Sequence, residues 1–286
     1  MDGSQIMVGF DGSAGGERAV RWAAREAQLR HMPLVICHAW DWSYPVPPSG
    51  PVVLGVVRKM GQHVLDKGLV IARETAPQIT VRERLVAGAP QAVLVNQSHH
   101  AALVVVGAEG KAEHAEGIIG SSAIRLPAYA HCPVVVVRQT TGRRDDPIVV
   151  GVDGSASAEA ALCFGFEEAA LRGRPLRALY GYWEPEAIAA CDTDARAEPE
   201  EVRRMAACRL ERIVAPWREK YPYVDAETSL VMAPPRQALL EAAQGAELMV
   251  VGGRGLGGMQ GLRLGAVSSA MLHQAPCSVA IVRPRT

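Results

Sequence analysis

Glycines in a fixed pattern follow one apolar run and recur in the second half of the chain. Gly107 ends the run Leu103–Val106 and is followed by Gly110, Gly120 and Ser121. The same glycines recur 145 residues later, as Gly252, Gly255 and Gly265. Glycine lets a backbone approach an anion closely, and a helix that begins just beyond the loop directs N–H groups at it. The pattern indicates a phosphate-binding loop, present twice.

A second repeated element follows the first apolar run of each half. Asp11-Gly12-Ser13 comes after Ile6–Phe10, and Asp153-Gly154-Ser155 comes after Ile148–Val152. Aspartate and serine are good helix N-caps, so these residues could simply start a helix. Recurrence at the end of a strand favours a ligand-binding role for Asp11 and Asp153 instead.

Short apolar runs alternate with helical patterns along the whole chain, which predicts parallel sheets covered by helices on both faces. The strands expected in the first half are Ile6–Phe10, Leu34–Ala39, Thr80–Val86, Leu103–Val106 and Val134–Val137. In such sheets a ligand binds beyond the carboxyl ends of the strands, where the strand order switches. Asp11, the Trp40 region, Gly88 and the Gly107 loop should therefore converge on one crevice.

The repeat divides the 286 residues into two domains, each long enough to bury its own core. We expect domains at residues 1–140 and 147–286, joined by a linker at residues 141–146 within the polar segment Gln139–Asp146. The runs Val134–Val137 and Val279–Val282 are outer strands with exposed edges, so pairing between them is favoured.

Composition argues against several classes of protein. With 30 basic and 30 acidic residues the formal net charge is zero, so no nucleic acid or membrane partner is expected. No apolar run is long enough to span a membrane, and no charged leader precedes the first strand. Six cysteines without a C-x-x-C pair indicate reduced thiols. These features predict a cytoplasmic protein.

Motifs for other chemistries are absent from the sequence. No G-x-G-x-x-G follows either first strand, and neither G-x4-G-K-[ST] nor G-x-S-x-G occurs. His99, His100 and His114 lack metal-ligand spacing, so no metal site is expected.

The motifs together resemble the universal stress protein family in its tandem form. They are VGFDGS (Val8–Ser13), VGVDGS ending at Ser155, VAGAP (Val86–Pro90), the Gly107 loop, VVGGRGLGG (Val250–Gly258) and APCSVAIVR (Ala275–Arg283). The resemblance implies two adenine-nucleotide-binding-like α/β domains, each with a five-stranded parallel sheet. It also implies an ATP-binding regulator of stress response and growth rather than an enzyme, with homodimerisation and an unidentified protein partner.

The family's nucleotide site can be carried over to this chain position by position, and it falls on two sets of residues. In each set the resemblance implies that the aspartate holds the nucleoside and that the loop holds phosphates, with or without Mg²⁺. They are Asp11, Gly88, Gly107, Gly110, Gly120 and Ser121 in the first half, and Asp153, Gly252, Arg254, Gly255, Gly265 and Ser268 in the second.

Both halves depart from the family pattern. The first loop carries Glu109, Lys111 and Glu113 in a stretch that the family fills with glycine and arginine, and glutamates repel a triphosphate. The second half has Ala233 in place of Gly88 and Ala266 in place of Ser121. Two alternatives therefore stay open: an interaction scaffold that binds no nucleotide, and a slow ATPase.

Overall fold

The computed structural model describes residues 5–41, 51–110, 119–139, 143, 145–183, 199–256 and 263–284. The chain divides into two compact units, Met1–Gln139 with Ser278–Ile281, and Thr140–Cys277 with Val282–Pro284. Lys111, Glu113 and His114 of the first loop, and half of the predicted linker, lie outside the described residues.

Unit 1 is built on a parallel sheet. Its strands are β1 (Ile6–Gly9), β2 (Leu34–Trp40), β3 (Val81–Ala87), β4 (Leu103–Gly107) and β5 (Val134–Val137). They lie in the order β3-β2-β1-β4-β5. In the register of the sheet, Ile6 of β1 lies opposite Leu34 on one side and Leu103 on the other. The central strands are buried because helices cover both faces, which explains their apolar sequences.

Unit 1 also contains Ser278–Ile281 of β10 (Ser278–Val282), which pairs antiparallel with β5. Val279 lies opposite Val136 and Ile281 lies opposite Val134. The pairing expected from the two valine-rich runs is confirmed, and it satisfies the N–H and C=O groups that β5 would otherwise expose.

Unit 2 repeats the parallel arrangement. Its strands are β6 (Ile148–Gly151), β7 (Leu176–Gly181), β8 (Ala226–Val231) and β9 (Leu248–Gly252). They follow the order β9-β6-β7-β8, so β6 lies between β7 and β9 as β1 lies between β2 and β4. The α/β fold with parallel strands, predicted from the alternating pattern, is confirmed.

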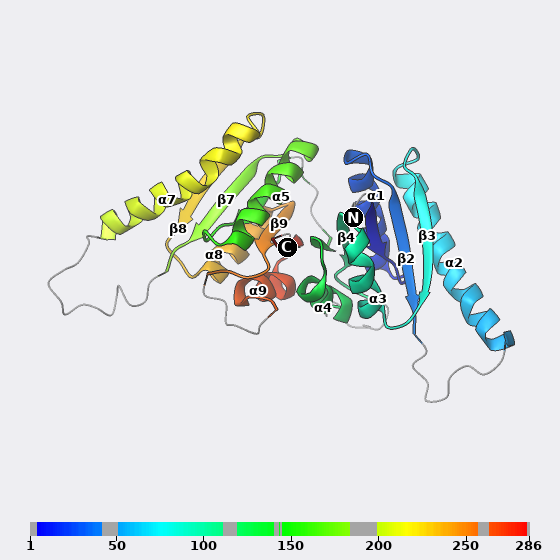
Figure 1. Ribbon diagram of the computed structural model, residues 1–286. Helices are drawn as coiled ribbons and strands as arrows, with labels where there is room; N and C mark the ends of the chain where they lie inside the picture. The colour runs from blue at the N-terminus through cyan, green and yellow to red at the C-terminus, as the bar shows by residue number, and fades with distance from the viewer. Residues whose placement is uncertain are drawn as a thin grey trace. The chain divides into compact units, whose positions relative to one another are not determined.

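Helices cover both faces of each sheet (Figure 1). In unit 1 they are α1 (Ala14–Leu29), α2 (Pro51–Thr75), α3 (Pro90–Gln97) and α4 (Ser121–Tyr129). In unit 2 they are α5 (Ala156–Arg172), α7 (Pro199–Lys220), α8 (Pro235–Ala242) and α9 (Ala266–Gln274). Helices α1 and α2 contact each other, as do α3 and α4; α5 with α7, and α8 with α9, repeat these pairs. Among the described residues, none of the helices is both long and apolar enough to cross a membrane.

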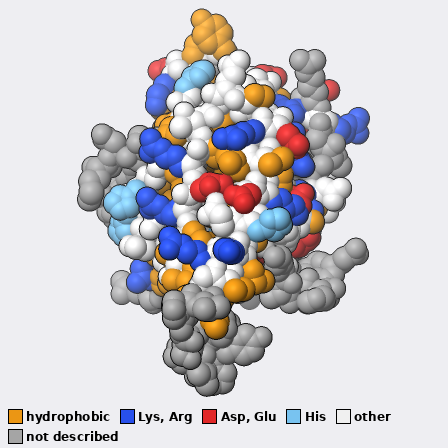
Figure 2. Space-filling view, turned by 90° about the vertical axis from the view of Figure 1, so that its right-hand side faces the viewer, with side chains coloured by type: hydrophobic (Ala, Val, Ile, Leu, Met, Phe, Trp, Pro, Cys, Tyr) orange, Lys and Arg blue, Asp and Glu red, His pale blue; other side chains and the backbone are white. Residues whose placement is uncertain are grey.

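Strand β3 forms the outer edge of unit 1 and carries a run of charge. Arg82, Glu83 and Arg84 are exposed on it. Figure 2 views this side, where basic, acidic and hydrophobic side chains are interspersed rather than gathered by kind. Charged side chains on an edge strand oppose pairing with another chain.

Two buried carboxylates stand at matching places in α1 and α5. The Glu26 and Glu168 side chains are fully buried, and each pairs with an arginine four residues later, Arg30 or Arg172. Arg172 Nε donates to Glu168 Oε2 at 2.7 Å. A buried charge needs such a partner, since its removal leaves the other charge desolvated and uncompensated.

Arg172→Ala should therefore lower the free energy of unfolding by about 3 kcal/mol, because it removes the arginine that pairs with the buried Glu168 carboxylate. The matched control is Arg204→Ala, since Arg204 is 72% exposed and its partner Glu201 is 52% exposed. An exposed pair contributes about 0–1 kcal/mol. Urea denaturation measures both, and equal small losses would contradict the argument.

The described cysteines differ sharply in exposure. Cys37 and Cys277 are buried, and Cys208 is exposed. Burial raises the pKa of Cys37 from 9.0 to about 11, against a smaller lowering by Arg84. The thiolate is the reactive form, so Cys37 should be inert in the folded protein.

A disulfide reagent at pH 8 should label Cys208 rapidly and Cys37 only after denaturation, as mass spectrometry of the peptides can establish. The raised pKa also favours folding below pH 9.0, and this contribution is lost as the pH rises towards about 11. The stability difference between the wild type and Cys37→Ala should thus narrow above pH 9. Rapid labelling of Cys37 in the native protein would contradict its burial and its raised pKa.

Candidate functional site

In each unit, the connections that leave two neighbouring central strands run to opposite sides of the sheet. The chain leaves β1 towards β2 and leaves β4 towards β5, and the same divergence separates β6 from β9. A crevice opens at the carboxyl ends of strands that diverge in this way. In both units the predicted loop and the predicted aspartate lie at that crevice.

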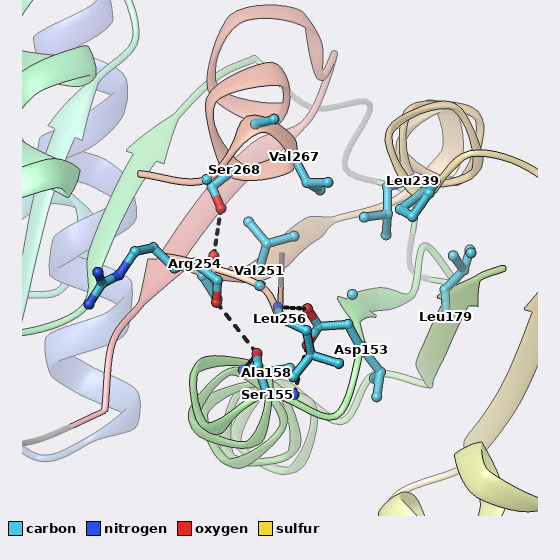
Figure 3. A pocket seen from close by; sticks show the side chains of 18 residues that line it. Asp153, Ser155, Ala158, Leu179, Leu239, Val251, Arg254, Leu256, Val267 and Ser268 are labelled. Carbon is cyan, nitrogen blue, oxygen red and sulfur yellow. Dashed lines mark hydrogen bonds between the residues drawn. The ribbon is translucent and has the colours of Figure 1, made fainter. Parts of the chain in front are cut away.

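The crevice of unit 2 has a volume of about 320 Å³, within the range usual for small-molecule sites. Every residue predicted for the second half lines it: Asp153, Gly252, Arg254, Gly255, Gly265 and Ser268. Figure 3 shows Leu179 and Leu239 on one side of this cleft, with Ser268 and Arg254 towards the other. The cleft thus has an apolar wall and a wall made of loop backbone.

The crevice of unit 1 is smaller, about 250 Å³. Of the residues predicted for the first half it is lined by Asp11, Gly107, Gly110, Gly120 and Ser121. Gly88 lies at the end of β3, outside the lining residues. Its φ of +132° is a conformation that favours glycine. Gly88 therefore serves the turn between β3 and α3.

The corresponding turn of unit 2 accommodates Ala233 without that conformation. Within the described part of the chain, His31 is the one non-glycine residue with positive φ, so Ala233 has an ordinary backbone. Its N–H donates to Val231 C=O at 2.9 Å. The exchange of glycine for alanine thus reflects a different turn and leaves the cleft open.

The two aspartates do not cap the helices that follow them. The caps are Ser13 and Ser155, whose hydroxyls accept from Gly16 N–H and Ala158 N–H. Asp11 and Asp153 instead accept from the N–H of the capping serines at 2.9 Å. The interpretation of the aspartates as simple caps is wrong, and each carboxylate is held at the mouth of its cleft.

Asp153 also links the two segments that form the unit 2 site. Its Oδ2 accepts from Leu256 N–H of the loop after β9 at 3.0 Å, a contact drawn in Figure 3. The carboxylate therefore fixes the start of the loop against the turn after β6.

Backbone hydrogen bonds close both glycine loops in the same way. Gly120 N–H donates to Ala108 C=O at 2.7 Å, and Gly265 N–H donates to Gly253 C=O at 2.9 Å. In unit 2 the buried Ser268 hydroxyl adds a bond to Gly252 C=O at 2.6 Å. In unit 1, Gln91 Nε2 donates to the Ser121 hydroxyl at 2.8 Å. The Ser268 hydroxyl thus bonds the backbone of the loop itself.

The helices that begin at these loops lack side-chain caps. Gly120 and Gly265 are the N-caps of α4 and α9, and neither makes a side-chain capping bond. The first N–H groups of a helix have no partners within the helix, and its N-terminus carries partial positive charge. Each cleft therefore offers backbone N–H groups suited to an anion.

Sequence reasoning missed several residues that shape the clefts. They are the apolar side chains Leu94, Leu179 and Leu239, the ring of His38, and Gln91. His38 Nδ1 lies 2.7 Å from Phe10 C=O, at the end of β2. Leu94 and Leu239 occupy matching positions in α3 and α8, so the internal repeat was the signal that could have identified them.

Sequence comparison agrees with this geometry. A family model described as the universal stress protein family matches residues 4–138 and, a second time, residues 146–283. The chain belongs to the universal stress protein family.

Curated universal stress proteins align along nearly the full length. One from Mycolicibacterium smegmatis is 34% identical over 289 residues, covering 98% of this chain and 97% of that protein. One from Mycobacterium tuberculosis is 33% identical over 291 residues, covering 97% and 96%. The crystal structure of a universal stress protein from Archaeoglobus fulgidus matches with a TM-score of 0.74 at 14% identity, covering 100% of both chains. That structural likeness supports the tandem fold.

Packing explains the first glycine of each loop. A Cβ on Gly107 would lie 2.6 Å from the Gly15 carbonyl carbon and oxygen in α1. A Cβ on Gly252 would lie 2.7 Å from the Ser157 carbonyl carbon in α5. Real Cβ atoms do not approach this closely, so these glycines permit the contact between strand end and helix.

Gly252→Ala should consequently destabilise unit 2 by about 1–3 kcal/mol, because β9 and α5 must move apart. Thermal unfolding without added ligand measures the loss. Gly245→Ala is the matched control, because no atom of the described residues lies within 4 Å of a Cβ at that position. A Gly252→Ala protein as stable as the wild type would show that the contact is dispensable.

Proposed function

We propose that this universal stress protein binds an adenine nucleotide, ATP with Mg²⁺, in at least one of its two clefts. The nucleoside lies along the apolar wall beside the aspartate, and the phosphates lie at the glycine loop. Occupancy then alters a surface that a protein partner reads. We further propose that it acts in the cytoplasm as a homodimeric regulator of stress response, with domains at residues 1–140 and 147–286.

The observation that carries this proposal is Gly265. A Cβ built there would lie 3.5 Å from Arg254 Cα, which is ordinary contact, and its φ of −74° suits any residue. Among the described residues, neither packing nor backbone conformation therefore requires glycine at this position, unlike at Gly252. Close approach of a ligand to the N-terminus of α9 explains the absent side chain.

The helix N-termini at the two loops support the same interpretation. Helices α4 and α9 begin with glycines that make no side-chain capping bond, whereas serine hydroxyls satisfy the first turns of α1 and α5. Phosphate oxygens would accept from the N–H groups that remain.

The test is the nucleotide content of freshly purified protein, released by heat and resolved against ATP, ADP and AMP standards. The wild type should release ATP in proportion to protein, and Mg-ATP should raise its unfolding temperature. Gly265→Ala should retain the fold and weaken unit 2 binding at least tenfold, because its methyl group occupies the anion's place at the helix end.

Gly245→Ala is again the control and should bind as the wild type does. A protein that neither carries nucleotide nor responds to Mg-ATP would refute nucleotide binding and favour the scaffold alternative.

A further inference from the structure

The two clefts share a backbone plan but carry opposite charge at one matching position. Glu109 lies two residues after Gly107, and Arg254 lies two residues after Gly252. Glu109 and Arg254 each line the cleft of their unit. The internal repeat therefore provides a matched comparison in which the loop is kept and its charge is reversed.

In unit 1 the loop carboxylate is paired. Arg18 Nη2 of α1 donates to Glu109 Oε2 at 2.7 Å, with the Glu109 side chain 49% exposed. This pair is electrically neutral as a whole and places its acidic member on the loop. Within the described part of the unit 1 loop, this pair thus adds no net positive charge near the helix N-terminus.

In unit 2 this arginine–glutamate ion pair is absent, because different residues occupy both positions. Ala160 occupies the place of Arg18, and Arg254 makes no ion pair among the residues that the structure describes. Figure 3 shows the Arg254 side chain extending away from Asp153. The positive charge of the loop therefore lies on the side opposite the carboxylate.

Two further arginines of unit 2 adjoin the same loop. Arg283 Nη2 donates to Arg263 C=O at 2.8 Å, and the Arg283 stem lies beside Gly253, where a Cβ would be 3.1 Å from its Cγ. Burial lowers the pKa of Arg283, and the charges of Arg263 and Arg254 lower it further. Arg254, Arg263 and Arg283 form what we call the arginine cluster, a group of like charges close enough to repel one another.

Repulsion between neighbouring positive charges raises the free energy of the unoccupied site, and a bound anion reduces this repulsion. The cluster makes the electrostatic potential at the loop more positive. The favourable binding free energy therefore increases with the number of negative charges on the ligand. A neutral nucleoside gains nothing from it. The paired Glu109 of unit 1 provides no such gain.

We propose that the unit 2 cleft selects its ligand by phosphate number, preferring nucleoside triphosphates and diphosphates to monophosphates and nucleosides, while the unit 1 cleft discriminates less strongly by phosphate number. This inference rests on the proposed nucleotide binding and assigns different ligand classes to the two sites.

Titration calorimetry of the full chain with ATP, ADP, AMP and adenosine tests the assignment. Arg254→Glu should weaken ATP binding at one site about tenfold at low salt and leave adenosine binding unchanged. Glu109→Arg should strengthen ATP binding at the other site. Arg204→Glu, a charge reversal at an exposed position of α7, is the matched control and should change neither.

The outcomes separate the two proposals. If no wild-type site binds any of the four ligands, nucleotide binding itself fails, and the selectivity fails with it. If nucleotides bind but Arg254→Glu weakens all four equally, or none, selection by phosphate number is overturned while nucleotide binding stands. Arg254→Gln, which removes one charge where Arg254→Glu reverses it, should give an intermediate loss, and a full loss would indicate a packing role instead.

Discussion

The close approach of a strand end to a helix is the contact on which each cleft depends. β4 ends against the first turn of α1 at Gly107, and β9 ends against α5 at Gly252. A side chain at either glycine would force strand and helix apart. Because the loop starts at this contact, its position relative to the aspartate after the first strand follows from the packing. The geometry of the site is therefore a consequence of the core.

The glycines predicted to form the nucleotide sites consequently serve different physical purposes. Gly107 and Gly252 are required by packing, Gly88 by its positive φ, and Gly265 by neither. A motif written as a string of glycines hides this division. The distinction matters because a substitution at a packing glycine disturbs the fold, whereas one at Gly265 reports on the cleft.

The two repeats have the same backbone at the glycine loop but different side-chain charges on it. Both loops close through the same backbone hydrogen bond, from Gly120 to Ala108 and from Gly265 to Gly253. Backbone bonds tolerate changes in the side chains around them. Glu109 and Arg254 could thus take opposite charges without altering the loop, and two similar clefts present different potentials to a ligand.

The sequence alone determined the parallel α/β fold, the internal repeat and the loops, because strand burial and glycine spacing are local properties of the chain. It also predicted that Asp11 and Asp153 lie just beyond the end of a strand, and both do. Tertiary structure decided what each residue does: serines cap the helices, Ser268 turns to the loop, and Gly88 serves a turn. Only tertiary structure brought Arg254, Arg263 and Arg283 together, since their proximity depends on packing between segments distant in the chain.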